Sequence, residues 1–174
     1  AELPDGVPGF QALDELELRA YPTYRLVRTK MRVRSTAAFW PLFRHIQSHD
    51  IAMTTPVQID YRSDGAQPRE ASMAFLYGSR ALGATGREGS VEVVDVPATN
   101  VITVGSRGLA RPDRIAAMRS RLEGWIARSP VWRSAGPMRV MEYNSPFVRG
   151  DRRYFEVQIP VARREAKTGK RVKV

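Results

Sequence analysis

The chain has 174 residues, of which 43% are hydrophobic and 26% are charged, and these values are typical of one globular domain with its own core. It contains no cysteine, which excludes disulfides, thiolate catalysis and cysteine-ligated zinc or iron–sulfur centres. No apolar run reaches the roughly 20 residues of a membrane-spanning helix. We therefore expect a soluble protein, and the start at Ala1 fits either a cytoplasmic protein or the mature form of an exported, periplasmic one.

The net charge of +10 favours contact with anions and raises the question of nucleic-acid binding. Half of this charge comes from residues 161–174, which carry six basic residues and one acid. That stretch has no apolar periodicity, so we predict that residues 162–174 form a flexible basic tail. The other basic residues are scattered along the chain, and we expect no specific nucleic-acid partner.

The N-terminal part of the chain predicts an irregular lead-in followed by two strands. Residues 1–13 are rich in proline and glycine, which disfavours regular structure. Apolar and polar residues then alternate over 16–21 and over 24–33, and Pro22 separates the two runs. The pattern is typical of two strands with a break between them.

A helix is predicted after these strands, because apolar residues recur at helical spacing over residues 39–46. The dipeptide Ser35-Thr36 is a suitable N-cap. Proline is tolerated in the first turn of a helix, so Pro41 indicates that the helix begins near Ala37. The helix is expected to end at His49-Asp50.

The rest of the chain repeats this order of elements. Further strands are predicted at 57–61, 72–77, 91–96, 100–104, 138–143 and 154–159, and a second helix from Arg111. The breaks at Pro22 and Pro97 lie 75 residues apart. We interpret residues 14–161 as a single domain of two repeats, about 14–80 and 90–161, that share a core. The predicted class is α+β: a distorted antiparallel β-barrel of about eight strands with two helices, built from two ββαββ-like repeats.

Three segments resemble the SOUL/haem-binding-protein family. IAMTTPV (residues 51–57) is similar to the family segment K-I-x-M-T-x-P-V, with Ile51 in place of its Lys-Ile start. Residues 72–76 are similar to the strand that follows it. Residues 143–157 are similar to the family ending Y-[ND]-x-P-x(n)-R-R-x-E-[VI], with one extra residue before Glu156. The resemblance covers about residues 14–161.

The resemblance implies a distorted barrel of two halves that binds haem or a related tetrapyrrole in a cleft beside the first helix. The same architecture occurs in bacterial domains that bind bulky apolar cations, so the fold does not define the ligand. We predict a protein that sequesters or carries haem. The alternative is a module of the same fold that binds a hydrophobic cation or a protein partner without haem.

The predicted haem site lies on the first helix. A haem site needs apolar walls, positive charge near the propionates and, in some proteins, an axial ligand. His45 and His49 lie on one flank of the apolar stripe, where either could ligate the iron. The other candidates are Phe39, Trp40 and Met53 as walls and Arg28, Arg44 and Arg152 for the propionates.

The histidines have other interpretations as well. Two histidines on one helix face cannot occupy opposite axial positions of one iron, so at most one ligates haem, or the pair binds a small ion such as Zn²⁺. A histidine at a helix end is also typical of a solvated face or a C-terminal cap. Met53 is interpreted as a buried side chain that fills the core in preference to an iron ligand.

No catalytic pattern is found, and we do not predict an enzyme. No serine lies in a GxSxG context, and the acids show no paired spacing. The glycine-rich segment 83–89, which carries Arg87 and Glu88, lacks the pattern of a phosphate-binding loop. The sequence leaves the oligomeric state open.

Overall fold

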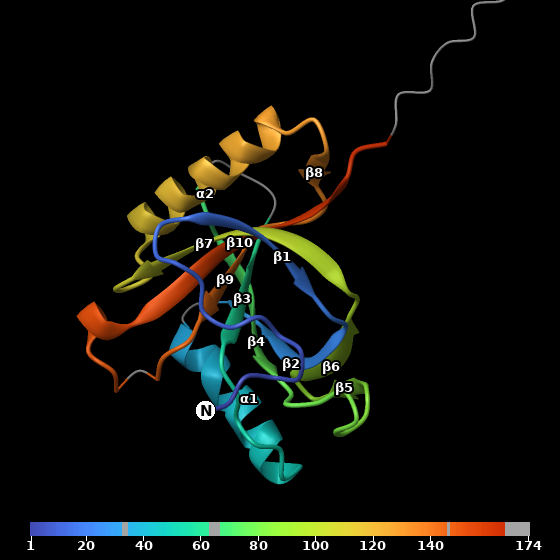
Figure 1. The fold of residues 1–174 in the computed structure, drawn as a ribbon. Coiled ribbons are helices and arrows are strands. Elements are labelled where there is room, and N and C mark those ends of the chain that lie inside the picture. Colours follow the sequence, from blue (N-terminus) through green and yellow to red (C-terminus); the bar gives the residue numbers. More distant parts are fainter. Residues whose placement is uncertain (33–34, 63–66, 146, 166–174) are drawn as a thin grey trace, which may run out of the picture.

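The computed structural model describes residues 1–32, 35–62, 67–145 and 147–165, and Figure 1 shows their arrangement. These residues form ten strands, two α-helices and one short 3₁₀ helix. In chain order the elements are β1 (Leu16–Tyr21), β2 (Tyr24–Lys30), α1 (Ser35–Ser48), β3 (Val57–Tyr61), β4 (Glu70–Leu76), β5 (Gly86–Glu88), β6 (Val91–Val96), β7 (Thr99–Arg107), α2 (Pro112–Arg128), β8 (Trp132–Ser134), β9 (Arg139–Glu142), η1 (Gly150–Arg152) and β10 (Tyr154–Arg163).

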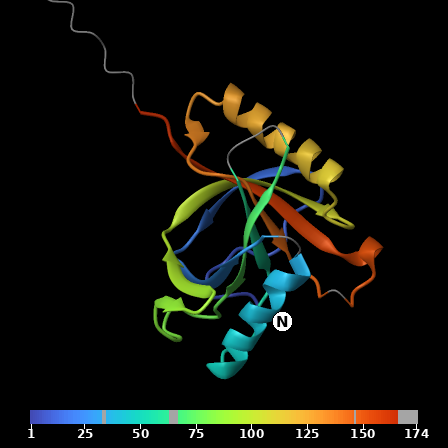
Figure 2. The ribbon, with the colours of Figure 1, turned by 180° about the vertical axis from the view of Figure 1, so that it is seen from behind.

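All ten strands belong to one antiparallel sheet, which confirms the α+β class with two helices. The strand order is β1-β7-β10-β9-β3-β4-β2-β6-β5, and β8 pairs with β10. The sheet curls strongly (Figures 1 and 2) but does not close into the predicted barrel of eight strands. The reason is that β5 pairs with the outer edge of β6, and within the described residues no strand joins β1 to that end of the sheet.

The strand order is symmetric about the pair β3–β9. On one side the order continues β4, β2, β6, and on the other side it continues β10, β7, β1. The first half of the chain supplies β1, β2, α1, β3 and β4, and the second half supplies β6, β7, α2, β9 and β10 in the same order. That the halves arose as repeats of one unit stays a prediction.

The two faces of the sheet bury different side chains. One face packs against both helices: α1 contacts β2 and β4, and α2 contacts β7 and β10 (Figure 1). This face is apolar because alternate strand residues such as Val27, Phe75 and Val157 meet Leu42 and Leu122 of the helices. The opposite face, inside the curl, carries aromatic and polar side chains instead.

Helix α1 differs from the prediction at its start and agrees with it at its end. It begins at Ser35, so Pro41 lies inside the helix and the predicted start near Ala37 was wrong. Packing of the buried face offsets the missing backbone hydrogen bond. At the other end, Asp50 has a φ of 53°, and the amide of Ile51 donates to the carbonyl of Ile46 at 2.8 Å. This is the Schellman arrangement that ends many helices.

The described ends of the chain pack against the rest of the domain. In the lead-in, Val7 is buried and the amide of Asp5 donates to the carbonyl of Gly78 at 2.9 Å. At the other end β10 continues to Arg163, beyond the predicted domain boundary, because it pairs there with β8. The rest of the predicted tail, residues 166–174, lies outside the described residues. No helix in the described ranges is long and apolar enough to cross a membrane.

Leu42 tests the packing of α1. Its side chain is fully buried against the sheet, so Leu42→Ala should lower the free energy of unfolding by about 2–5 kcal/mol through lost contacts and a cavity. Urea unfolding followed by circular dichroism measures this. Gln47→Ala, an exposed position on the same helix, is the control and should change stability by less than about 0.5 kcal/mol. Equal losses in the two variants would contradict this packing.

Candidate functional site

His45 lies on the buried side of α1. Ala38, Leu42 and Ile46 are buried on the same side, at the spacing of successive helical turns. The side chain of His45 is 5% exposed, and its Nε2 lies 2.9 Å from the hydroxyl of Tyr77, which follows β4. The predicted position at the boundary of the apolar stripe was therefore wrong for His45, because the prediction left Ala38 out of the buried face.

His49 lies just beyond the last residue of α1 and caps the helix. Its Nδ1 lies 2.9 Å from the carbonyl oxygen of His45. A carbonyl only accepts hydrogen bonds, so this nitrogen carries the proton and donates it. His49 thus has the geometry of a C-terminal cap. The other ring nitrogen, Nε2, lies on the side of β5.

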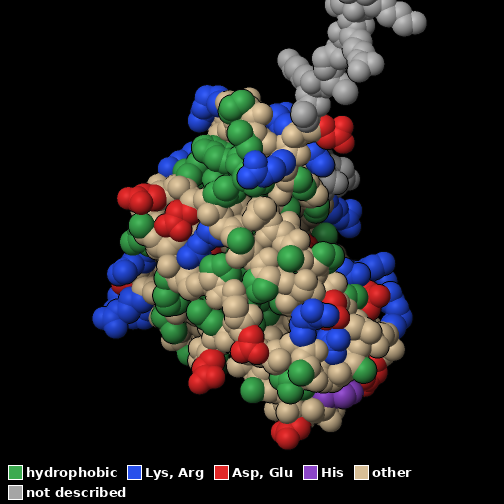
Figure 3. Space-filling model, turned by 45° about the vertical axis from the view of Figure 1, so that its right-hand side comes forward, with side chains coloured by type: hydrophobic (Ala, Val, Ile, Leu, Met, Phe, Trp, Pro, Cys, Tyr) green, Lys and Arg blue, Asp and Glu red, His purple; other side chains and the backbone are tan. Residues whose placement is uncertain are grey.

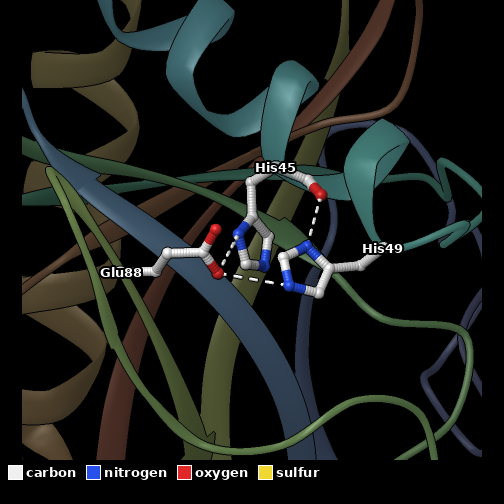
Figure 4. Close-up of side chains that lie close together, drawn as sticks. All are labelled: His45, His49 and Glu88. Carbon is white, nitrogen blue, oxygen red and sulfur yellow. Dashed lines mark hydrogen bonds and ion pairs between the residues drawn. The ribbon is translucent and has the colours of Figure 1, made fainter.

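Glu88 from β5 joins the two histidines. One carboxylate oxygen, Oε2, lies 3.5 Å from Nδ1 of His45 and 3.2 Å from Nε2 of His49 (Figure 4). The two imidazole rings are 4.3 Å apart at their centroids. We call these three residues the imidazole–carboxylate cluster. Sequence reasoning missed Glu88, because the contact is made by a strand about forty residues from the helix.

The cluster lies at the surface, but the side chain of His45 is buried from solvent. Figure 3 shows imidazole atoms on the molecular surface beside acidic side chains. Burial, and secondarily the neighbouring His49, lowers the pKa of His45, while Glu88 opposes this shift. Among the described residues, the buried Nδ1 of His45 has no hydrogen-bond partner. A neutral imidazole therefore presents an unsatisfied nitrogen to Glu88.

The predicted aromatic residues form a separate surface on α1. Phe39 and Phe43 stack with their centroids 5.6 Å apart, and Trp40 meets Phe39 edge-on at 5.6 Å. We call these three residues the aromatic face. Trp40 is 58% exposed, and Phe39 reaches the core through an edge-on contact with Phe75. The face thus joins the core on one side and is open to solvent on the other.

The aromatic face and the histidines point in different directions. At about 100° per residue, Trp40 and His49 lie on opposite sides of the helix axis, and Trp40 and His45 are about 140° apart. A flat ligand on Trp40 therefore cannot be ligated by either histidine. Arg44 is exposed next to the aromatic face, at about 40° from Trp40 around the axis.

The remaining predicted residues are spread over the surface. Met53 is 36% exposed, so its interpretation as a buried core residue was wrong; Ile51 and Thr54 take the inward positions of this corner. Arg28 is held by Glu92 at 3.0 Å. Arg152 is exposed on η1, outside α1. On the face in Figure 3, Lys and Arg side chains occur at several separate places.

The inside of the curl holds a buried polar cluster that the sequence analysis did not single out. We call it the polar interior, and its members are Tyr21, Tyr24, Gln58, Arg139, Tyr143, Glu156 and Gln158, all buried. Arg139 donates to Gln158 and to the hydroxyl of Tyr24, both at 2.8 Å. Glu156 accepts from Tyr143 at 3.1 Å and from Gln158 at 2.8 Å. The sequence signal for this cluster was the alternation of Glu156 and Gln158 with the apolar Phe155 and Val157, because successive residues of a strand face opposite sides of the sheet.

A groove of about 560 Å³ lies beside α2, on the far half of the sheet from α1. Its apolar lining includes Ile126, Met138 and Ile159, and Arg119 and Glu123 form an ion pair at its rim at 2.6 Å. We call it the α2 groove. It contains none of the residues predicted for the haem site.

Residues 7–160 match the family described as SOUL heme-binding protein. The chain belongs to this family. The match spans both helices and all but the end of the last strand. The resemblance noted from three short segments is confirmed. No curated protein gives a significant match to the sequence.

Several solved structures share the fold at low sequence identity. An uncharacterized conserved protein from Listeria innocua has a TM-score of 0.66 at 9% identity, over 86% of this chain and 93% of that one. A hydrolase from Listeria innocua has a TM-score of 0.63 at 8% identity, over 88% and 94%. The C-terminal domain of EcmrR has a TM-score of 0.62 at 14% identity, over 85% and 97%. These likenesses concern the fold alone.

Glu156 tests the polar interior through pH. Burial raises the pKa of this carboxyl, so the folded state holds its proton more tightly than the unfolded chain. The resulting stability is present below the unfolded pKa, about 4.3, and is lost as pH rises through the folded value. Wild type should therefore lose stability relative to Glu156→Gln between pH 4.5 and pH 8, measured by urea unfolding.

The control for Glu156→Gln is Glu123→Gln, which removes one carboxylate from the protein surface. If the two substitutions gave the same dependence on pH, the effect would come from net charge and not from burial of Glu156.

Proposed function

We propose that this protein binds a tetrapyrrole, with haem as the first candidate, on the aromatic face of α1, and that it sequesters or carries the ligand. Membership of the SOUL heme-binding protein family supports the ligand class. The exposed Trp40, backed by the stacked Phe39 and Phe43, is the single observation that carries the location. A flat macrocycle stacks well on such a surface.

The residues fit haem as an apolar ring with negative side groups better than they fit it as a ligated iron. Arg44 lies beside the aromatic face, where a guanidinium can pair with a propionate. The net charge of +10 favours an anionic ligand in the same way. The Nε2 of His45 is hydrogen-bonded to Tyr77, and both His45 and His49 face away from Trp40. When bound, haem would supply a strong visible absorption and a redox-active iron.

A haemin titration tests the site. Trp40→Ala removes the exposed ring of the aromatic face and should weaken haemin binding about tenfold or more, because one aromatic contact contributes on the order of 1.5 kcal/mol. Absorption between 350 and 700 nm follows the binding. Leu18→Ala, another exposed apolar residue, is the matched control and should bind as wild type does.

His49→Ala completes the titration. It should retain the Soret shift, because this proposal needs no histidine ligand. Loss of the shift in His49→Ala, with binding kept in Trp40→Ala, would place haem on the histidine side of α1 instead. Absence of a saturable shift in wild type would rule out haem as the ligand.

The α2 groove supports a second candidate, a binding module for a bulky apolar cation. Its volume and its Ile126, Met138 and Ile159 lining suit an apolar ligand, and a cation there would compete with Arg119 for the Glu123 carboxylate. The ligand bound in the α2 groove, and not a ligand on α1, would then define the function. The two candidates use opposite halves of the sheet, so one variant in each half distinguishes them.

Ala127→Trp tests the second candidate. Ala127 is exposed and lines the groove, so a tryptophan there should fill it without changing the core. A fluorescent lipophilic cation, followed by fluorescence anisotropy, is the probe. Binding to wild type that is lost in Ala127→Trp and kept in Trp40→Ala supports the groove; binding that is unchanged in Ala127→Trp contradicts it.

A further inference from the structure

The imidazole–carboxylate cluster brings three potential metal ligands together at the end of α1. The donor atoms of His45, His49 and Glu88 all lie within 4.8 Å of one another. They come from two elements, the helix end and strand β5, that the fold places side by side (Figure 4). These are the only two histidines of the chain, so the arrangement cannot be confused with another imidazole pair.

His49 brings an unprotonated ring nitrogen close to Glu88. Its Nδ1 donates to the carbonyl of His45, so the neutral ring has its lone pair on Nε2. This Nε2 lies 3.2 Å from Oε2 of Glu88. Two acceptors at this distance repel unless a proton or a cation lies between them. Metal-ligating histidines typically hold the second ring nitrogen on a carbonyl in this way.

His45 supplies the second, independent observation. Its Nδ1 is buried and, in the part of the chain that the structure describes, has no hydrogen-bond partner. Its Nε2 is within hydrogen-bond distance of the Tyr77 hydroxyl, which fixes the ring and can accept the proton of Nε2. The Nδ1 lone pair is then free, and Nδ1 lies 3.5 Å from Glu88 Oε2. An unsatisfied buried nitrogen is costly unless a ligand completes it.

Two of the three distances between the donor atoms suit a small tetrahedral ion. Ligands at 2.0–2.1 Å from a tetrahedral Zn²⁺ lie roughly 3.3 Å from one another, and the two nitrogen–oxygen distances of the cluster are 3.5 and 3.2 Å. Two imidazoles and one carboxylate are a donor set for Zn²⁺, Co²⁺ or Ni²⁺, while Ca²⁺ and Mg²⁺ prefer oxygen donors. The Glu88 side chain is 61% exposed, which leaves a fourth position open to water.

We propose that His45 Nδ1, His49 Nε2 and Glu88 form a binding site for one divalent transition-metal ion of the Zn²⁺ type, with an open fourth position. The ion would link the end of α1 to β5, two elements about forty residues apart in sequence. The site stabilises the native state, because the unfolded chain does not bring the three ligands together. This inference is independent of tetrapyrrole binding, because Trp40 lies on the other side of the helix.

The test uses the untagged full chain, freed of metal with a chelator. Calorimetry with ZnCl₂ should show one equivalent bound, and the melting temperature should rise with the Zn²⁺ concentration. Co²⁺ should give visible absorption bands of a four-coordinate site. His49→Ala and Glu88→Gln, both at exposed positions, should each weaken Zn²⁺ binding by tenfold to a hundredfold. Tyr77→Phe, which removes the partner of Nε2, should weaken it about tenfold.

Asp50→Asn is the matched control, because it removes an exposed carboxylate next to His49 that is not in the cluster. It should bind Zn²⁺ as wild type does. Absence of saturable Zn²⁺ and Co²⁺ binding to wild type would overturn the proposal and leave the cluster as a proton-mediated ion pair. Equal binding by wild type and Glu88→Gln would also overturn it. Trp40→Ala should keep Zn²⁺ binding whether or not it binds haemin. The outcome for the metal site is therefore distinguishable from the outcome for the tetrapyrrole proposal.

Discussion

The packing of α1 against β2 and β4 constrains the rest of this structure, because a helix can bury only one of its sides. Ala38, Leu42 and Ile46 bury that side, and His45 falls on it as well. The same rotation of the helix turns Trp40 out to solvent. The imidazoles therefore face the neighbouring strands and Tyr77, and the aromatic residues form an open surface. Two chemically different candidate sites on one short helix follow from this one packing arrangement.

The curl of the sheet encloses a space that side chains fill. The inner face is filled by the polar interior, in which Arg139 and Glu156 satisfy buried tyrosine and glutamine side chains. Such a network specifies one arrangement of the strands and leaves its groups engaged with one another. The candidate sites instead lie outside the curl, on α1, beside α2 and at the β5 end of the sheet.

The position of β5 has a larger effect than its three residues suggest. By pairing with β6 it occupies the edge through which the sheet could have closed, and it also brings Glu88 to the end of α1. An edge strand of this kind protects the edge from unwanted pairing. In this protein it additionally adds a carboxylate to two imidazoles, so the open end of the sheet and the imidazole–carboxylate cluster have the same origin.

The sequence by itself determined the elements that depend on local patterns: both helices, most strands, the end of α1 and the family. Alternation and helical spacing are properties of neighbouring residues, which is why they can be read along the chain. Only the tertiary structure decided the open sheet, the burial of His45 and the contact with Glu88. These depend on which distant strand occupies an edge and how a helix is rotated against it. The strand at the edge and the rotation of the helix both depend on packing between residues that are far apart in sequence. A local sequence pattern therefore does not encode them.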